Sequence, residues 1–262
     1  MSYADVNGLH LYFEEHGSGG TPLVLLHGGL SAGEVLAPLT AALAAGRRVI
    51  VPDLQGHGRT ADVDRPLLPE LLADDVAALV EHLGLARVDL MGYSFGGAVA
   101  LRTAIQHPSV VRRLVLVSVP FARAGQHPDA LEAMDAMTPA IAEAMKQAPI
   151  YALYERIAPN PDAWVTLVAK TSELLKVDYD WRTETGALAA RTMLVFADAD
   201  SIRPAHIVEF FALLGGGLRD AGVDGSARPA ARLAVLPGTT HYDLTESPLL
   251  VPAVAAFLDA PG

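Results

Sequence analysis

A serine stands between two glycines where a short apolar run ends. Residues 92–96 read Gly-Tyr-Ser-Phe-Gly, and residues 87–91 before them form the apolar run. This G-x-S-x-G spacing is typical of a sharp strand-to-helix turn that exposes a serine hydroxyl above a sheet. The glycines are needed because strand and helix nearly touch there. A purely structural turn is the alternative, but the small residues that follow favour a nucleophile at Ser94. A serine hydroxyl is weak, so it needs a base and N–H groups that hold the developing oxyanion.

The base is expected at His241. This histidine follows the last strand-like run, residues 231–236, just after a Pro-Gly pair. Histidine can exchange a proton near neutral pH, so a loop at a strand end suits a general base. A surface-loop or helix-capping histidine is the alternative. His57 lies within Gly-His-Gly and His27 at another strand end, and we expect both to shape their loops rather than to react.

A carboxylate that could orient the imidazole follows another apolar run, residues 193–196. Asp198 and Asp200 both lie just after this run. A lone loop aspartate is often solvated or caps a helix, so the residues alone leave both open as the acid.

The elements that must position these side chains alternate between strand and helix. Short apolar runs at residues 23–26, 48–51, 87–91 and 114–117 are typical of strands buried on both faces. Amphipathic or small-residue segments separate them, including residues 68–83 with Pro69 near the start and Gly84 past the end. This order predicts an α/β fold: a mostly parallel sheet with helices on both faces and ligands at the carboxyl ends of the strands.

Two local features are expected at the amino-terminal side. Asn7-Gly8 before the alternating residues 9–15 predicts a hairpin at a sheet edge. The spacing Ser31-x-x-Glu34 predicts a capping box that opens the next helix, although Pro38 leaves the start uncertain.

The alternation of strand-like and helical segments stops between residues 120 and 186. No strand-like run occurs there, and helical stretches are separated by prolines. We interpret residues 120–186 as an inserted helical cap and residues 1–119 and 187–262 as the core domain. Both tryptophans, Trp164 and Trp181, fall in the cap. They could line an apolar pocket, but ordinary core is the more economical interpretation of each.

Composition narrows the class of protein. The 262 residues are 51% hydrophobic and 19% charged, which suits a single folding unit with a sizeable core. The formal charge of −11 and the lack of a basic patch argue against nucleic acid and anionic membranes as partners. No run approaches the roughly 20 apolar residues that cross a bilayer, and the first residues do not resemble a signal peptide, so a cytoplasmic protein is expected. The absence of cysteine excludes thiolate catalysis and disulfides.

Taken together, the chain resembles the α/β-hydrolase fold family, and specifically its capped members with a serine nucleophile. The resemblance covers residues 23–119 and 191–258, with the cap between them. In that family the order is nucleophile, acid, histidine. The resemblance implies Ser94, Asp200 and His241 as the triad, because Ala197, Asp200 and Pro204 match the family spacing around the acid.

The resemblance also implies how the oxyanion is held. The backbone N–H groups of Phe95 and, in the His-Gly-x loop, Gly29 would form the oxyanion hole. Neither a phosphate loop nor a dinucleotide fingerprint is present, so no cofactor and no metal are expected.

The function that follows is hydrolysis of a small or medium apolar carboxylic ester, lactone or thioester through an acyl-enzyme. A carbon–carbon bond hydrolase, an acyltransferase and a cofactor-free perhydrolase share this chemistry and remain open. A small-molecule receptor with slow or no turnover is the alternative from another class. A serine at the elbow argues against family members that form an alkyl ester on an aspartate.

Overall fold

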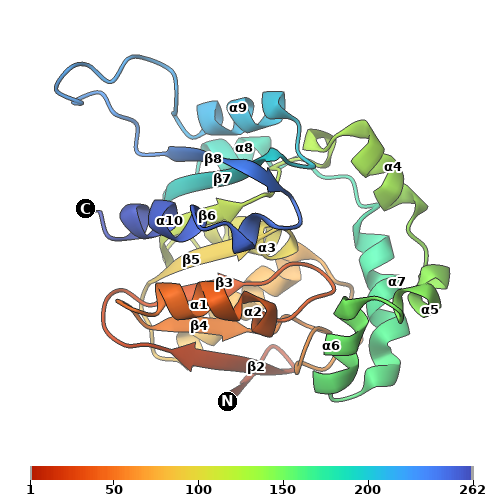
Figure 1. Ribbon diagram of the computed structural model, residues 1–262. Coiled ribbons are helices and arrows are strands. Elements are labelled where there is room, and N and C mark those ends of the chain that lie inside the picture. The colour runs from red at the N-terminus through yellow and green to blue at the C-terminus, as the bar shows by residue number, and fades with distance from the viewer. Residues whose placement is uncertain (1, 261–262) are drawn as a thin grey trace.

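A computed structural model describes residues 2–260 and contains one eight-stranded sheet (Figure 1). The strand order is β1-β2-β4-β3-β5-β6-β7-β8. The pairs β1–β2 and β2–β4 are antiparallel and the others are parallel. The strands are β1 Ser2–Val6, β2 Leu9–His16, β3 Leu23–Leu26, β4 Val49–Pro52, β5 Val88–Tyr93, β6 Val111–Val117, β7 Arg191–Ala199 and β8 Arg232–Thr240.

Helices connect the parallel strands, and several of them begin at a proline. Proline suits the first helical turn because its missing N–H would have no partner there. The α-helices are α1 Ala37–Leu43, α2 Pro69–His82, α3 Phe95–Gln106, α4 Pro128–Ala136, α5 Ala142–Met145, α6 Pro149–Ile157, α7 Trp164–Leu174, α8 Arg182–Gly186, α9 Pro204–Leu213 and α10 Leu250–Leu258. The alternating α/β pattern expected from the sequence is therefore confirmed.

Two apolar layers sandwich the sheet. Alternate residues of the buried strands face opposite sides: Leu23 and Leu25 pack with α1 and α10, whereas Val24 and Leu26 pack with α2 and α3. Figure 1 shows α1 and α10 together on one face. Because both faces are covered, the polar residues that follow the strands are left at the carboxyl edge of the sheet.

The expected hairpin is present at one edge of the sheet. Asn7 and Gly8 connect β1 to β2, and both have positive φ angles, 48° and 82°. These angles are those of the tight turns that Asn-Gly favours.

The expected capping box is wrong. A short 3-10 helix, Gly33–Leu36, comes first with Ala32 at its N-cap, and α1 begins only at Ala37. The Gly33 N–H instead donates to the Asp53 carboxylate at 2.8 Å, so a residue distant in sequence satisfies this helix start. Glu34 is used by the side chains of Arg59 and Arg156.

The last strand is longer than the sequence indicated. It continues through Pro237 and Gly238 to Thr240 because the Asp198 carboxylate accepts hydrogen bonds from the N–H groups of Gly238 and Thr239. The strand therefore runs up to His241.

Between β6 and β7, the elements of the described chain are helical, and Figure 1 shows α4 to α7 grouped at one side of the sheet. Two ion pairs connect them to loops that follow β3 and β4: Arg156 to Glu34, and Lys170 to Asp62 at 2.6 Å. These loops lie at the carboxyl edge, so the helices stand over that edge.

Both tryptophans are buried. Trp164 packs between two tyrosines and donates to the Ala142 carbonyl at 3.0 Å. Trp181 stacks on Tyr179. Their contacts are those of ordinary core residues.

Candidate active site

Ser94 lies at the junction of β5 and α3 in a backbone conformation that is rare for serine. Its φ is 53° and its ψ is −118°. A Cβ on Gly92 would lie 2.1 Å from the Gly96 carbonyl oxygen, and one on Gly96 would lie 2.4 Å from the His27 carbonyl oxygen. Both positions therefore exclude any side chain, as the sequence pattern indicated.

His241 reaches this serine from the loop after β8. Ser94 Oγ and His241 Nε2 lie 3.0 Å apart, which is hydrogen-bond distance. The imidazole is 15% exposed. The Tyr93 hydroxyl donates to the His241 carbonyl oxygen at 2.6 Å and so ties the two loops together.

The structure separates the two aspartates that the residues alone left open. Asp200 is buried, and its Oδ1 lies 3.4 Å from His241 Nδ1. Asp198 is solvent-exposed, and its carboxylate accepts from the backbone N–H groups of Gly238 and Thr239 in β8. Asp200 is therefore the carboxylate beside the imidazole.

Asp200 is held ionised by its neighbours. Burial alone would raise the pKa of this carboxyl group, but hydrogen bonds from His241, the Ala197 N–H and Ser118 outweigh burial and lower it. An ionised carboxylate next to an imidazole favours the protonated imidazolium when it forms.

Two further hydroxyls lie at His241 Nδ1, and sequence reasoning missed both. Ser118 Oγ is 2.6 Å away and Ser201 Oγ is 3.2 Å away. Ser118 directly follows β6, which neighbours β5 in the sheet. Its position at a strand end was the available signal, because the carboxyl ends of parallel strands meet at one edge.

The two residues expected to form the oxyanion hole are neighbours. Phe95 is the first residue of α3, where helix N–H groups lack intrahelical partners. A Cβ built on Gly29 would lie 3.6 Å from the Phe95 Cβ. The next residue, Leu30, has a φ of 55°, and its N–H donates to His57 Nε2 at 3.0 Å.

His27 and His57 brace the same loop through both of their ring nitrogens. In His27, Nδ1 lies 2.7 Å from the Gly28 carbonyl oxygen and Nε2 accepts from the Leu54 N–H at 3.0 Å. In His57, Nδ1 lies 2.8 Å from the Gln55 carbonyl oxygen. Burial lowers the pKa of His27 to about 4 and that of His57 to about 3. Both rings are neutral at neutral pH, as loop-shaping residues should be.

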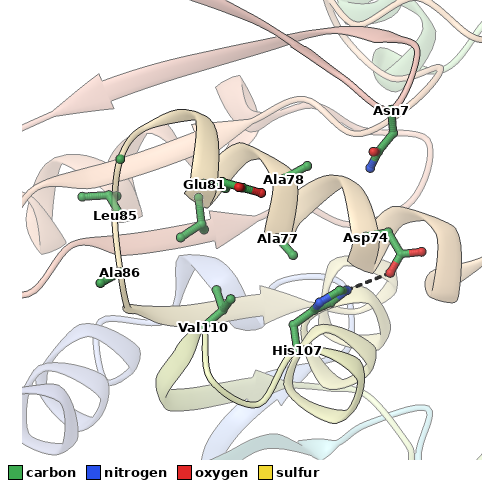
Figure 2. Close-up of a pocket in the computed structure, with 11 residues that line it drawn as sticks. Asn7, Asp74, Ala77, Ala78, Glu81, Leu85, Ala86, His107 and Val110 are labelled. Carbon is green, nitrogen blue, oxygen red and sulfur yellow. Dashed lines mark hydrogen bonds and ion pairs between the residues drawn. The ribbon is translucent and has the colours of Figure 1, made fainter.

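The structure also contains a wide groove of about 810 Å³. Figure 2 shows the residues that line it. Its lining includes Asp74 and His107, whose side chains are 2.7 Å apart, and Ala86, which precedes β5. Ser94 follows the other end of β5, and a six-residue strand spans about 20 Å. The groove is therefore at the opposite edge of the sheet from Ser94.

Within residues 2–260, acidic and histidine side chains do not converge in a group of three or more that could hold a metal ion. None of the helices in this part of the chain has both the length and the apolar character needed to cross a bilayer.

The mostly parallel sheet carries Ser94, His241 and Asp200 at its carboxyl edge, which is the architecture of an α/β hydrolase. Comparison with known families agrees: the model of the alpha/beta hydrolase fold matches residues 21–242. The chain belongs to the α/β-hydrolase fold family.

Individual relatives match only parts of this chain. A segment of 107 residues is 39% identical to the 2-hydroxymuconate semialdehyde hydrolase of Pseudomonas sp. (strain CF600), covering 39% of this chain and 38% of that protein. Another of 119 residues is 46% identical to the dihydrolipoyllysine-residue acetyltransferase component of the acetoin cleaving system of Pseudomonas putida, covering 44% of this chain and 31% of that protein. The matches therefore span less than half of the length of these relatives.

Solved structures match the whole fold. The enol-lactonase from Burkholderia xenovorans LB400 superimposes with a TM-score of 0.72 at 23% identity, over 98% of this chain and all of that chain. This likeness concerns the fold.

Proposed function

We propose that this protein is a serine hydrolase that cleaves a small or medium apolar carboxylic ester, lactone or thioester. The observation that carries the proposal is the 3.0 Å contact between Ser94 Oγ and His241 Nε2, at a turn where Ser94 has a φ of 53°. Asp200 would act as the acid.

The geometry supports a two-step reaction. Ser94 Oγ attacks the carbonyl carbon while its proton passes to His241 Nε2, and the Phe95 and Gly29 N–H groups hold the oxyanion. His241 then protonates the leaving group, which departs and leaves an acyl group on Ser94. A water molecule then gives a proton to His241 and attacks the acyl carbon. The bond from that carbon to Ser94 Oγ breaks as His241 returns the proton to Oγ, which releases the carboxylic acid product and restores Ser94.

The helices between β6 and β7 would supply the substrate walls. Met137, Ile141 and Tyr151 from this segment are partly buried and pack against the same apolar core as Leu30 and Phe95. Apolar groups from both parts of the chain therefore favour an apolar acyl or ring portion in the substrate.

A second candidate is hydrolysis of a carbon–carbon bond next to a ketone. Two curated relatives are hydrolases named for 2-hydroxymuconate semialdehyde and 2-hydroxy-6-oxo-2,4-heptadienoate. The same serine, histidine and oxyanion donors would serve this reaction.

Burst kinetics with a short-chain p-nitrophenyl ester test the proposal. We expect a burst of p-nitrophenol proportional to enzyme concentration, which Ser94→Ala abolishes. Labelling by a fluorophosphonate probe should disappear in the same variant, while Ser201→Ala, in a neighbouring hydroxyl, should still be labelled. Labelling that persists in folded Ser94→Ala would remove Ser94 from the role. Tight ligand binding without turnover would instead indicate a receptor. Turnover of 2-hydroxy-6-oxo-2,4-heptadienoate but not of esters would indicate the second candidate.

A further inference from the structure

The Ser118 hydroxyl lies between the imidazole and the carboxylate of the candidate site. Its Oγ is 2.6 Å from His241 Nδ1 and 2.7 Å from each carboxylate oxygen of Asp200. The direct distance from His241 Nδ1 to Asp200 Oδ1 is 3.4 Å. Ordinary N–H···O hydrogen bonds are about 2.7 to 3.2 Å long, so the path through the hydroxyl is the better one.

The hydrogen-bond donors and acceptors of Asp200, Ser118 and His241 allow one arrangement of protons along this path. An ionised carboxylate only accepts, so the single Ser118 proton goes to Asp200. The hydroxyl oxygen can then accept only from a proton on His241 Nδ1. With that proton on Nδ1, the neutral ring has an unprotonated Nε2, which is the nitrogen that faces Ser94.

We propose that Ser118 is a positioning residue: its hydroxyl links the Asp200 carboxylate to the His241 imidazole by hydrogen bonds and fixes the imidazole tautomer. The inference deepens the proposed function and rests on it, since it concerns the base of the same site. When the Ser94 proton moves to Nε2, the Nδ1 proton stays in its bond to Ser118, and Ser118 continues to donate to Asp200. No proton reaches the carboxylate, so the hydroxyl acts only through charge and geometry.

The backbone supports a role for the hydroxyl itself. Ser118 has a φ of 53°, in the left-handed region that glycine adopts with less strain. It is buried, and its N–H donates to the Val195 carbonyl oxygen at 2.8 Å. Ser118→Gly should therefore ease the backbone while it removes the Oγ.

A second hydroxyl at the same imidazole offers a graded comparison. Ser201 Oγ is 3.2 Å from His241 Nδ1 and 3.5 Å from Asp200 Oδ1, both longer than the Ser118 contacts. We expect Ser201→Ala to lower kcat less than Ser118→Ala does, because both of its contacts are longer.

The test combines kinetics with 15N NMR of histidine-labelled protein. In the wild type, the His241 signals should show the proton on Nδ1 alone; in Ser118→Gly and Ser118→Ala, both tautomers should appear. Turnover of the p-nitrophenyl ester should fall about 10- to 100-fold in kcat, the loss expected when a hydrogen bond to a charged group is removed, with KM nearly unchanged. The thermal midpoint of Ser118→Gly should not fall below that of the wild type.

The outcomes separate this inference from the proposed function. An unchanged tautomer in both variants, or an unchanged kcat, would overturn the role of Ser118. A wild type that turns over no ester but shows the tautomer change would contradict the proposed function and leave the proton arrangement standing. If Ser118→Gly does not fold, the tautomer in Ser118→Ala decides.

Discussion

Loops on either side of the turn at Ser94 carry histidines with opposite environments. On one side, His27 and His57 are fully buried, and both ring nitrogens of each contact backbone groups. On the other side, His241 is partly exposed, with Nδ1 held by polar side chains and Nε2 directed to Ser94. The first pair is fixed as neutral scaffolding, whereas the third ring has one nitrogen available to take a proton.

The difference shows what would distinguish the histidine proposed to react from a structural one at the same sheet edge. Proximity to Ser94 does not decide, since the His57 ring stacks on Phe95, the residue after Ser94. What decides is whether each ring nitrogen already has a backbone partner and whether burial prevents the ring from charging.

The largest expected effect on activity comes from a comparison in which one histidine from each side is replaced. His241→Ala should lower the rate of acylation at least about a thousandfold, as losses of triad members do. His57→Gln should lower it less than about tenfold, because that ring only holds the Leu30 N–H and the Gln55 carbonyl. Pre-steady-state ester hydrolysis by variants shown to be folded measures both. Equal losses would mean that the two sides do not differ in role.

The roles of Asp200, proposed as the triad carboxylate, and Asp198 can be distinguished in the same way. Asp200→Asn should reduce kcat about a hundredfold or more, because an amide beside Nδ1 favours the wrong tautomer and does not stabilise the imidazolium. Asp198→Asn should stay within about threefold, since an amide oxygen can still accept from the β8 backbone. Steady-state kinetics on both variants give the ratio. A larger loss for Asp198→Asn would move the acid to that residue.

Much of this arrangement could be predicted because its signals are local in sequence. The apolar runs defined the strands, the glycines around Ser94 defined the turn, and His241 was singled out by its place after a strand. Asp200 required the family spacing as well, because its distance to His241 depends on how β7 and β8 lie side by side.

The remaining features depend on distant partners. Ser118 approaches His241 only because β6 lies between β5 and β7 in the sheet. The start of the first helix was wrong for a similar reason: the Gly33 N–H finds the Asp53 carboxylate, 20 residues away, instead of a local cap. These contacts depend on the order of the strands in the sheet, which no local sequence pattern predicts.

The burial of His57 also predicts an effect on stability in acid. The folded pKa of His57 is about 3, below its ordinary value of 6.5, so the unfolded chain binds the proton first as the pH falls. The stabilisation is therefore complete above about pH 6.5 and is lost progressively down to about pH 3, at up to about 1.4 kcal/mol per pH unit. His57→Gln should be less stable at pH 7 by about 1 kcal/mol, because the Leu30 N–H loses a well-placed acceptor, yet its stability should fall less steeply between pH 6 and pH 4. Urea unfolding at several pH values measures both quantities. His27→Gln serves as a parallel test, since the pKa of His27 is about 4, and identical slopes in the wild type and both variants would show that these rings do not stay neutral in the folded protein.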